Sequence, residues 1–371
     1  MGKKGIMRIL GLILLCFFLV KCGQPSENSN QIDQTVEVRY AKHFKLAQHE
    51  HYTVLSILQP ETGKVEREYA LVKKADKSFA PAGMDQLEVP VKRMAVLSTT
   101  HIGMLDAIDA LDCVKGATDK NFISNKQILK GINAGDIVGF SDETAITPEQ
   151  LLGNEISVVV YSGFGKGFPN EDKLKQLEVL ALADYDWREE HPLGKAEWIK
   201  VFGFLTGKEQ QAMAYFATVE KTYNETKKKL QNAKQRPKVL VGSLIGESWF
   251  APAGESYMAQ LLRDAGADYL YKDMKGTGSC ERTLEQVFKD QEATKLWINA
   301  GATSLPDLLK QQQKYGLFTS FKEGKVYCYT HNSNYFWEMG AANPHWVLND
   351  LAIICGQQKG GKLHFYKQLE R

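Results

Sequence analysis

The chain has 371 residues, a formal net charge of +2, 43% hydrophobic residues and 24% charged residues. These values are typical of a globular protein of about two domains, and they exclude a disordered chain, a collagen and a disulfide-rich miniprotein. The near-zero net charge argues against nucleic-acid binding, which normally needs a concentrated basic excess. Only the N-terminal segment is apolar enough to enter a membrane, which excludes a polytopic transporter or channel.

The N-terminus has the features of an export signal. Basic residues at positions 3, 4 and 8 precede an unbroken apolar run over residues 9–20. This order is that of a secretory signal peptide, and the run is too short to span a bilayer comfortably. We therefore expect an exported protein and leave this segment out of the folded domains.

A lipid anchor is predicted from the residues that follow. Residues 19–23 (Leu-Val-Lys-Cys-Gly) resemble the lipobox of bacterial lipoproteins, although Lys21 stands where a small residue is usual. The resemblance implies a lipoprotein signal peptide at 1–21 and a lipid on Cys22 that holds the protein at the membrane, facing the periplasm. Residues 22–35 are polar and aperiodic, which indicates a tether. Cleavage to a freely soluble exported protein is the alternative.

The cysteines after Cys22 give little further information. Cys113, Cys280, Cys328 and Cys355 form no Cys-x-x-Cys pair, which excludes zinc-ribbon and thioredoxin-like sites. In an exported protein they could form disulfides, and as buried thiols they would act as small hydrophobes. Their spacing leaves both possibilities open.

The first lobe is expected over residues 36–192. Alternating apolar and polar residues predict a β-meander with strands at 36–40, 52–58 and 69–72 and a turn at 61–64. From Met94 onward, short β-branched runs alternate with helical stretches, which predicts an α/β fold with a largely parallel sheet. The expected elements are a strand at 94–98, helices at 101–111 and from 147, and a strand at 156–161.

The same order of elements recurs over residues 237–371, which we expect to form a second lobe. Its elements are a strand at 238–242, helices at 256–265 and from 283, and a strand at 295–299. Both lobes contain a Thr-x-Glu-Gln helix start. We expect Thr147 and Thr283 as N-caps, with Glu149 and Glu285 in the first helical turn, where the helix dipole favours a carboxylate. The favourable interaction of a carboxylate with a helix N-terminus is enough to explain one such glutamate. It explains less easily why both lobes have one at the equivalent place.

A helical region over residues 193–236 separates the lobes. The sequence predicts one helix at 193–205, a break at Gly207 and a long helix at 208–234 whose apolar residues recur on one face. Pro237 ends the long helix. The predicted fold class is therefore α/β, with two α/β lobes of largely parallel sheets joined by a long inter-lobe helix and a ligand cleft between the lobes. Such a helix predicts limited lobe movement.

Several stretches together carry a resemblance to a known family. They are residues 89–101 (VPVKRMAVLSTTH), 192–199 (PLGKAEWI), 249–254 (WFAPAG) followed by 264–267 (DAGA), and 336–338 (FWE) through Pro344 to 348–351 (LNDL). In this order and spacing they resemble the periplasmic substrate-binding proteins of ABC importers for iron chelates, such as siderophores and haem, and for cobalamin. The resemblance covers most of the chain from about Val89.

The resemblance implies partners as well as a fold. In that family the ligand lies between the lobes, and one exposed glutamate on each lobe docks onto arginines of the membrane permease. Those glutamates correspond to Glu149 and Glu285. Exposed charges at a docking rim contribute encounter rate and register more than affinity, as a transient contact requires. ATP hydrolysis would belong to the ATPase subunits of the permease.

Candidate ligand contacts are sought in the loops at the carboxyl ends of the strands, where α/β lobes bind their ligands. The candidates are Ser98, Thr99, His101, Tyr161, Arg188, Trp249, Phe250, Tyr335, Phe336 and Trp337. Flat aromatic faces suit planar or macrocyclic ligands, although core packing is the ordinary role of any one aromatic residue. For Trp249, the flanking Ser248 and the following Ala-Pro-Ala-Gly favour a loop position.

Two of these candidates have specific alternatives. His101 could ligate a metal or a haem iron, but no other histidine is placed beside it by spacing, so a metal-ion site is not predicted. Arg188 could face an anionic ligand group, and its default role is a surface ion pair with Glu189 or Glu190.

Other function classes are less consistent with the sequence. It contains no Gly-x-Ser-x-Gly elbow, no full Gly-x-Gly-x-x-Gly fingerprint and no Walker motif, so we predict no enzyme and no cofactor. A surface-adhesion lipoprotein would not explain two matched lobes. We predict a monomeric solute receptor that binds a small metal chelate, an iron complex in the first place and a corrinoid such as cobalamin as the alternative, and that delivers it to an ABC permease.

Overall fold

The computed structural model describes residues 34–164 and 167–371. The predicted signal peptide at 1–21, the predicted lipidation site Cys22 and most of the tether lie outside the described residues. None of the helices that the structure describes combines the length and the apolar character that a bilayer-spanning helix needs.

Residues 34–88 form a separate five-stranded sheet, in the order β1-β2-β3-β4-β5. Its elements are β1 (Gln34–Thr35), β2 (Phe44–Gln48), β3 (Tyr52–Leu58), β4 (Val65–Val72), the 3₁₀ helix η1 (Lys74–Phe79) and β5 (Asp85–Glu88). Neighbouring strands are antiparallel except for the parallel pair β4–β5. The strands predicted at 52–58 and 69–72 are confirmed, β2 was missed, and the strand predicted at 36–40 is wrong.

A buried carboxylate explains why residues 36–40 are not a strand. The backbone N–H groups of Arg39, Tyr40 and Ala41 donate to Glu197 at 3.0, 2.7 and 2.9 Å. Lys200 forms an ion pair with the same carboxylate at 2.6 Å. Backbone donors that bind a side chain cannot also join a strand ladder, so a tertiary contact overrides the alternating pattern.

The N-terminal lobe is built on a second five-stranded sheet, in the order β10-β9-β6-β7-β8, in which all neighbouring strands are parallel. Its strands are β6 (Met94–Val96), β7 (Val114–Ala117), β8 (Val138–Gly139), β9 (Val158–Ser162) and β10 (Leu180–Asp184). The helices between them are α1 (Thr99–Asp106), η2 (Leu111–Cys113), η3 (Lys120–Phe122), α2 (Lys126–Ala134), η4 (Glu143–Ala145), α3 (Pro148–Gly153) and α4 (Glu171–Gln176). The N-terminal sheet packs beside this lobe, where the Tyr69 hydroxyl donates to the carbonyl of Ala181 at 2.6 Å.

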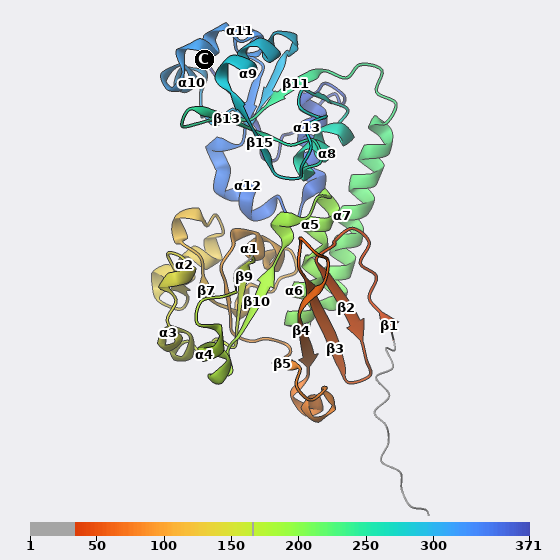
Figure 1. The fold of residues 1–371 in the computed structure, drawn as a ribbon, viewed down its shortest axis with the longest axis vertical. Helices are drawn as coiled ribbons and strands as arrows, with labels where there is room; N and C mark the ends of the chain where they lie inside the picture. The colour runs from red at the N-terminus through yellow and green to blue at the C-terminus, as the bar shows by residue number, and fades with distance from the viewer. Residues whose placement is uncertain (1–33, 165–166) are drawn as a thin grey trace, which may run out of the picture. The chain divides into compact units, whose positions relative to one another are not determined.

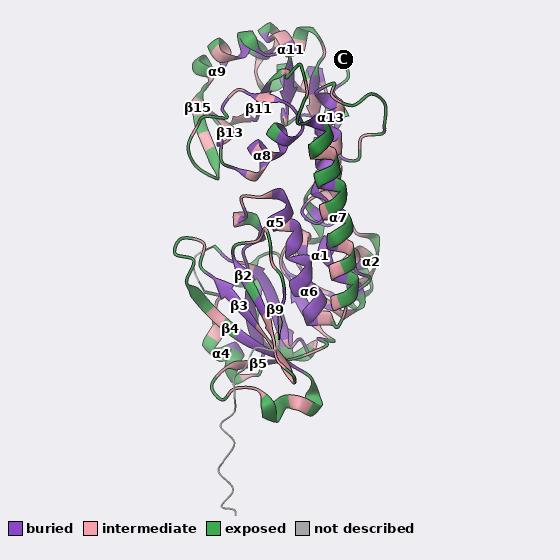
Figure 2. Ribbon diagram, turned by 90° about the vertical axis from the view of Figure 1, so that its right-hand side faces the viewer, coloured by how far each residue is buried: buried purple, intermediate pink, exposed green. Residues whose placement is uncertain are grey.

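The region between the lobes is helical, as predicted. It contains η5 (Asp186–Arg188), α5 (Pro192–Glu197), α6 (Ile199–Thr206) and α7 (Glu209–Leu230). The single helix predicted at 193–205 is two helices that meet at Trp198, and Gly207, in the left-handed region with φ of 69°, ends the second. The 22 residues of α7 extend over about 33 Å, and it contacts α6 and α13. Figure 2 shows its exposed face in green.

The C-terminal lobe has a third five-stranded sheet, in the order β14-β11-β16-β17-β18, and a three-stranded antiparallel sheet, β12-β13-β15. The strands are β11 (Lys238–Val241), β12 (Ser243–Ile245), β13 (Ser248–Pro252), β14 (Asp268–Tyr269), β15 (Ser279–Thr283), β16 (Leu296–Ile298), β17 (Val326–Cys328) and β18 (Lys367–Gln368). The helices are α8 (Tyr257–Asp264), α9 (Leu284–Asp290), η6 (Gln291–Ala293), α10 (Leu305–Gln311), η7 (Gln313–Leu317), α11 (Thr319–Lys322), η8 (Thr330–Asn332), α12 (Ser333–Met339) and α13 (Pro344–Ile354).

The predicted fold class is confirmed: the protein is α/β, with two lobes on parallel sheets and a long helix between them. β11, β14, β16 and β17 are parallel, and only β18 at the edge of that sheet runs antiparallel. Strands β6, β9 and β16 are buried on both faces, which is why their sequences read as continuous apolar runs. Figure 1 shows α12 lying against α1, which brings a segment of the C-terminal lobe onto the N-terminal lobe.

Candidate ligand-binding cleft

The carboxyl edge of the N-terminal lobe's parallel sheet forms a pocket. Its lining residues follow successive strands directly, and they are Leu97 after β6, Thr118 after β7, Phe140 with Asp142, Glu143 and Thr144 after β8, and Phe164 after β9. The pocket has a volume of about 430 Å³. Parallel α/β sheets bind ligands at this edge because the loops that leave the strands converge there. We call this site the edge pocket.

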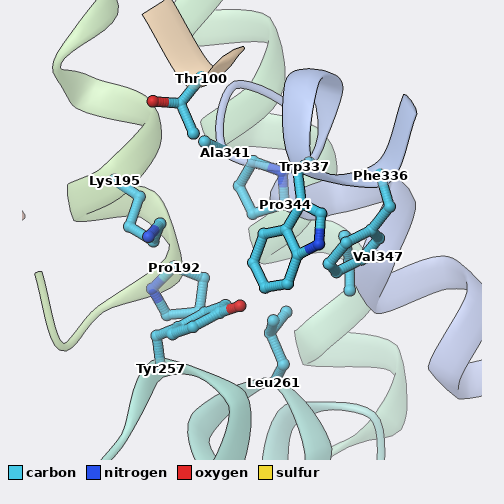
Figure 3. Close-up of a pocket in the computed structure, with 11 residues that line it drawn as sticks. Thr100, Pro192, Lys195, Tyr257, Leu261, Phe336, Trp337, Ala341, Pro344 and Val347 are labelled. Carbon is cyan, nitrogen blue, oxygen red and sulfur yellow. The ribbon is translucent and has the colours of Figure 1, made fainter. Parts of the chain in front are cut away.

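A second pocket lies between helices of both lobes (Figure 3). It is lined by Thr100 of α1, Pro192 and Lys195 of α5, Tyr257 and Leu261 of α8, Phe336, Trp337 and Gly340 at α12, and Ala341, Pro344 and Val347 at α13. The empty space between these atoms is about 400 Å³, but only about 30 Å³ is open to water-sized molecules. That is room for about one water molecule, so the helices are closely packed around it. We call this site the inter-lobe pocket.

Residues at the start of α1 contribute to both pockets. Leu97 lines the edge pocket, and Thr100, in the first turn of α1, lines the inter-lobe pocket. Between them, the Ser98 hydroxyl caps α1 by accepting the N–H of Thr100 at 3.4 Å. The predicted candidates Ser98 and Thr99 are therefore placed between the pockets, where both are partly exposed.

Exposed aromatic side chains gather on the segments that leave the strands. Phe122, Phe164, Trp187 and Trp337 follow β7, β9, β10 and β17, and they are 60%, 68%, 39% and 49% exposed. The rings of Phe164 and Trp187 lie 5.0 Å apart. Large exposed aromatics are costly in water, and their concentration at one kind of position indicates a binding surface.

Helix α12 is fastened to the N-terminal lobe. The Glu338 carboxylate accepts the backbone N–H groups of Ser124 and Asn125 at 2.8 and 3.0 Å. The Asn334 side chain donates to the carbonyl of Asn121 at 2.8 Å. These contacts hold the segment after β17 against the segment after β7, so the inter-lobe pocket is narrow because the lobes are closed on each other.

Lys195 and Tyr257 form the polar part of the inter-lobe pocket. The Lys195 ammonium lies 4.8 Å from the centre of the Tyr257 ring, in a cation–π contact. Burial raises the pKa of Tyr257, with Lys195 opposing the shift and Asp186 adding to it. Both residues were missed by sequence reasoning because they lie on helices and not in the loops after strands.

Several predicted candidates lie at or beside these pockets. Phe336 and Trp337 line the inter-lobe pocket, where Phe336 is buried and Trp337 is half-exposed. Tyr335 is partly buried and packs on Phe365, with ring centres 5.6 Å apart. Phe250 lies in β13, opposite Ser243 of β12, and lines neither pocket.

The prediction that Trp249 occupies a loop is wrong. Its side chain is fully buried in β13, where it packs on Trp297 with ring centres 5.5 Å apart. Its indole N–H donates to the carbonyl of Val241 at 3.2 Å. Ser248, Ala251 and Pro252 belong to the same antiparallel strand, and only Ala253 and Gly254 lie beyond its end. The serine beside Trp249 therefore reflects the alternation of side chains along a strand.

His101, another predicted ligand contact, lines neither of the two pockets. Its imidazole is fully buried in α1, and Nε2 lies 3.3 Å from Oδ2 of the buried Asp184. The ring packs 5.4 Å from Phe202. Tyr161 is likewise buried and packs on Phe168 at 5.0 Å, so neither side chain lines a pocket.

Arg188 forms an ion pair, but with a different partner from those expected. Its guanidinium lies 3.0 Å from Glu61 of the β3–β4 turn and 5.1 Å from the centre of the Trp187 ring. Glu189, one of the expected partners, is buried and accepts the N–H groups of Lys42 and His43. Burial raises the pKa of Glu189 to about 7, against the effect of those N–H donors.

The two predicted docking glutamates lie on the surface at matching helix starts. Thr147 and Thr283 cap α3 and α9 in complete capping boxes, which confirms that part of the prediction. Glu149 lies 3.9 Å from Lys173, and a backbone N–H lowers its pKa. Glu285 lies in a groove of about 290 Å³ on the outer face of the C-terminal lobe. That groove is also lined by Leu284, Phe288, Lys314 and Leu317.

The described residues include possible metal ligands and cysteine thiols. Across residues 34–164 and 167–371, no group of at least three His, Cys, Asp or Glu side chains is placed to hold a metal ion. Cys113, Cys280, Cys328 and Cys355 are free thiols.

Three exposed aromatic residues were not predicted as ligand contacts, although their positions after strands could have identified them. Phe122, Phe164 and Trp187 each follow a predicted or observed strand closely, which is the rule that selected the other candidates. Phe140 and Glu143 had no such signal, because β8 is only Val138–Gly139 and too short to be recognised.

Comparisons with known proteins agree with this architecture. A family model described as "Periplasmic binding protein" matches residues 94–332. An uncharacterized lipoprotein of Methanocaldococcus jannaschii is 29% identical over 293 residues, which are 76% of this chain and 69% of the relative. The N-terminal sheet before Met94 lies outside the region that the family model matches.

Solved structures of low sequence identity share the fold. A periplasmic heme binding protein from Pseudomonas aeruginosa has a TM-score of 0.57 at 14% identity, covering 74% of this chain and 96% of that protein. An ABC-type Fe3+-hydroxamate transport system protein from Saccharomonospora viridis has a TM-score of 0.55 at 17% identity, covering 73% and 95%. At these identities the likeness is one of fold.

Proposed function

This chain belongs to the periplasmic binding protein family, and from that premise we propose that it is the solute-binding component of an ABC importer and that its solute is an iron complex, a siderophore or haem. The observation that carries the proposal is the concentration of exposed aromatic side chains on segments leaving the carboxyl ends of both lobes' strands. The fold neighbours named above, one binding haem and one belonging to an iron-hydroxamate transport system, support the ligand class.

The aromatic side chains suit a ligand with a large, flat or apolar surface. Phe164 lines the edge pocket and packs beside Trp187, and Trp337 lines the inter-lobe pocket. Aromatic contacts contribute about 0.5–1.5 kcal/mol each beyond simple burial, with hydrogen bonds left to orient the ligand. No step of the proposed function needs catalysis or a resident cofactor.

The pocket volumes indicate how the ligand would enter. The edge pocket holds part of a chelate as it stands, whereas the inter-lobe pocket has room for about one water molecule. Binding of a whole chelate therefore requires α12 to move away from Ser124 and Asn125, where Glu338 now holds it. A ligand that binds the open arrangement better would shift the lobes toward it.

The ligand test uses the chain from Gly23 and its own tryptophans as reporters. Haemin, several ferric siderophores and cyanocobalamin are titrated in parallel while tryptophan fluorescence is recorded. Submicromolar saturation by an iron chelate alone supports the proposal. Saturation by cyanocobalamin alone would favour a corrinoid solute, and no response from any of them contradicts a chelate receptor.

We also propose that Glu149 and Glu285 dock the protein onto the permease with its ATPase subunits. Both carboxylates are exposed and lie on equivalent helices of the two lobes, and neither lines the edge pocket or the inter-lobe pocket. The double variant Glu149→Ala and Glu285→Ala should keep its ligand affinity and lose transport. Loss of ligand binding in this variant would contradict the docking role.

A lipid on Cys22 is the proposed attachment to the membrane, supported by the lipoprotein relative. The Cys22→Ala variant should move from the membrane fraction to the soluble fraction. If it remains with the membrane, another element anchors the protein.

A further inference from the structure

The charged side chains of the edge pocket are of one sign. Its described lining combines apolar Leu97, Phe140 and Phe164 with two threonines and the acids Asp142 and Glu143. Among these lining residues there is no lysine, arginine or histidine. The pocket is therefore an apolar cavity whose only formal charges are negative.

The two acids differ in how they are satisfied. Asp142 caps η4, where its Oδ1 accepts the N–H groups of Thr144 and Ala145 at 2.8 and 3.0 Å. Glu143 is partly buried, and in the part of the chain that the structure describes it forms no ion pair and no side-chain hydrogen bond. Burial raises the pKa of Glu143 and the charge of Asp142 raises it further, with His101 opposing the shift. A carboxylate that is partly desolvated and has no partner is stabilised when a cation binds beside it.

The cations around the cleft are already engaged. Arg188 is held by Glu61 at 3.0 Å, and Lys195 lies over the Tyr257 ring at 4.8 Å. The buried His101 faces Asp184 at 3.3 Å. Of these groups, His101 acts on Glu143 and partly opposes the rise of its pKa, but none of the three forms an ion pair with it. The formal charges of the described pocket lining are therefore negative.

The rim of the edge pocket also favours a cation. The Phe164 ring is 68% exposed and lies 5.0 Å from the Trp187 ring. The negative face of an aromatic ring attracts ammonium groups, most strongly where water is partly excluded. A carboxylate and an exposed aromatic ring that line the same pocket can recognise an ammonium group and disfavour a carboxylate.

We propose that the edge pocket binds an ammonium group carried by the transported chelate, with Glu143 as its counter-ion and Phe164 at its face. This inference rests on the proposed function and narrows the solute to chelates that carry a cationic arm, over anionic ones such as haem or carboxylate-rich siderophores. Glu143 acts here as a specificity determinant, because it contacts a part of the ligand distant from the iron.

The experiment uses two probes that differ in one charge. Ferrioxamine B carries a terminal ammonium on a ferric hydroxamate, and its N-acetyl derivative is neutral at the same position. Each is titrated by calorimetry into the chain from Gly23, into Glu143→Gln, and into the control Glu225→Gln on the exposed face of α7. Ferrioxamine B should bind at least about tenfold more tightly than the acetylated probe, since a charge-assisted contact is worth about that factor.

The variants separate a role in recognition from a role in folding. Glu143→Gln should abolish the preference for ferrioxamine B while its affinity for the acetylated probe and its urea midpoint stay unchanged. Glu225→Gln should keep the full preference. Equal affinities of the wild-type chain for both probes, or a preference that survives in Glu143→Gln, would overturn the inference.

Haemin and cyanocobalamin, as additional probes, distinguish failure of the cation site from failure of the proposed function. If haemin binds more tightly than ferrioxamine B, the chelate receptor stands and the cation site is overturned. If none of the four probes binds, the proposed function itself fails and the inference fails with it.

Discussion

The backbone carbonyl of Glu338 lies so close to Gly103 that a β-carbon at position 103 would stand 1.8 Å from its oxygen. The two residues belong to α12 and α1, so the C-terminal lobe touches the N-terminal lobe through bare backbone. The absence of a side chain at Gly103 is therefore a condition for the closed arrangement.

Gly103→Ala should push α12 away from α1. Overpacking of this kind costs about 2–3 kcal/mol. We expect the free energy of unfolding in urea to fall by that amount and ligand entry to become faster in stopped-flow fluorescence. Gly153→Ala is the control, because nothing lies within 4 Å of a β-carbon there, and it should stabilise the protein by about 0.4–1 kcal/mol. Equal effects of the two substitutions would show that the 103–338 contact is not special.

Glu338→Ala should also weaken the contact between α12 and the N-terminal lobe, because it removes the hydrogen bonds that the carboxylate accepts. It leaves the N–H groups of Ser124 and Asn125 without their acceptor, a loss of about 2–3 kcal/mol. Hydrogen exchange at these two amides should become faster. The control Glu323→Ala removes only an ion pair with Lys325 on the surface and should leave exchange at both amides unchanged. Full protection of Ser124 and Asn125 in Glu338→Ala would mean that the lobes are held by other contacts.

The two tryptophans selected from the sequence should behave differently. Trp337→Ala should weaken ligand binding about tenfold and remove most of the ligand-induced quenching, because this indole lines the inter-lobe pocket. Trp249→Phe should leave the ligand Kd unchanged and lower the free energy of unfolding by about 1–3 kcal/mol, because its buried indole packs in the core. The reverse pattern would place the ligand beside β13.

His345 should make stability depend on pH. Burial lowers its pKa to about 4, and His364 adds to the shift. The unfolded chain, with an ordinary histidine pKa near 6.5, therefore binds more protons between about pH 4 and 6.5. Folding stability should fall as the pH drops through this window, by up to about 3 kcal/mol from this group.

His345→Gln isolates that contribution. Glu189 acts in the opposite direction, because its pKa of about 7 makes stability fall as the pH rises from about 4.5 to 7. Urea unfolding of the variant and the wild type is therefore compared at each pH, so that the Glu189 contribution cancels. The difference should favour His345→Gln at pH 4 and decrease by pH 7, whereas His331→Gln on the surface should show no such trend.

Elements whose order depends on local pattern were predicted well. The buried strands β6, β9, β11 and β16 read as β-branched runs, and α7 shows its periodic apolar face with Phe216, Val219 and Tyr223 buried. Both capping boxes were readable because an N-cap and its first turn are adjacent in sequence. Errors occurred where a distant group intervened, as when Glu197 took the backbone donors of residues 39–41.

The candidate site was predicted only in part, for a similar reason. Phe336 and Trp337 were found because they follow a strand end, while Trp249 and His101 follow the same rule and are buried. Phe336, Trp337 and His101 lie on helices that follow strands, and Trp249 lies within β13. Whether each ring faces a pocket or the core depends on the face of its helix or strand that carries it. Spacing from the preceding strand does not determine that face.

The sequence by itself determined the alternation of strands and helices, the long helix and the paired glutamates at helix starts, because each depends on residues within a few positions of one another. Only the tertiary structure decided the closure of α12 on α1 and the gathering of Glu143, Phe140 and Phe164 around one pocket. Those features join segments that are far apart in the chain. Their free energies come from burial and from the pairing or absence of charged partners, which exist only once the strands are side by side.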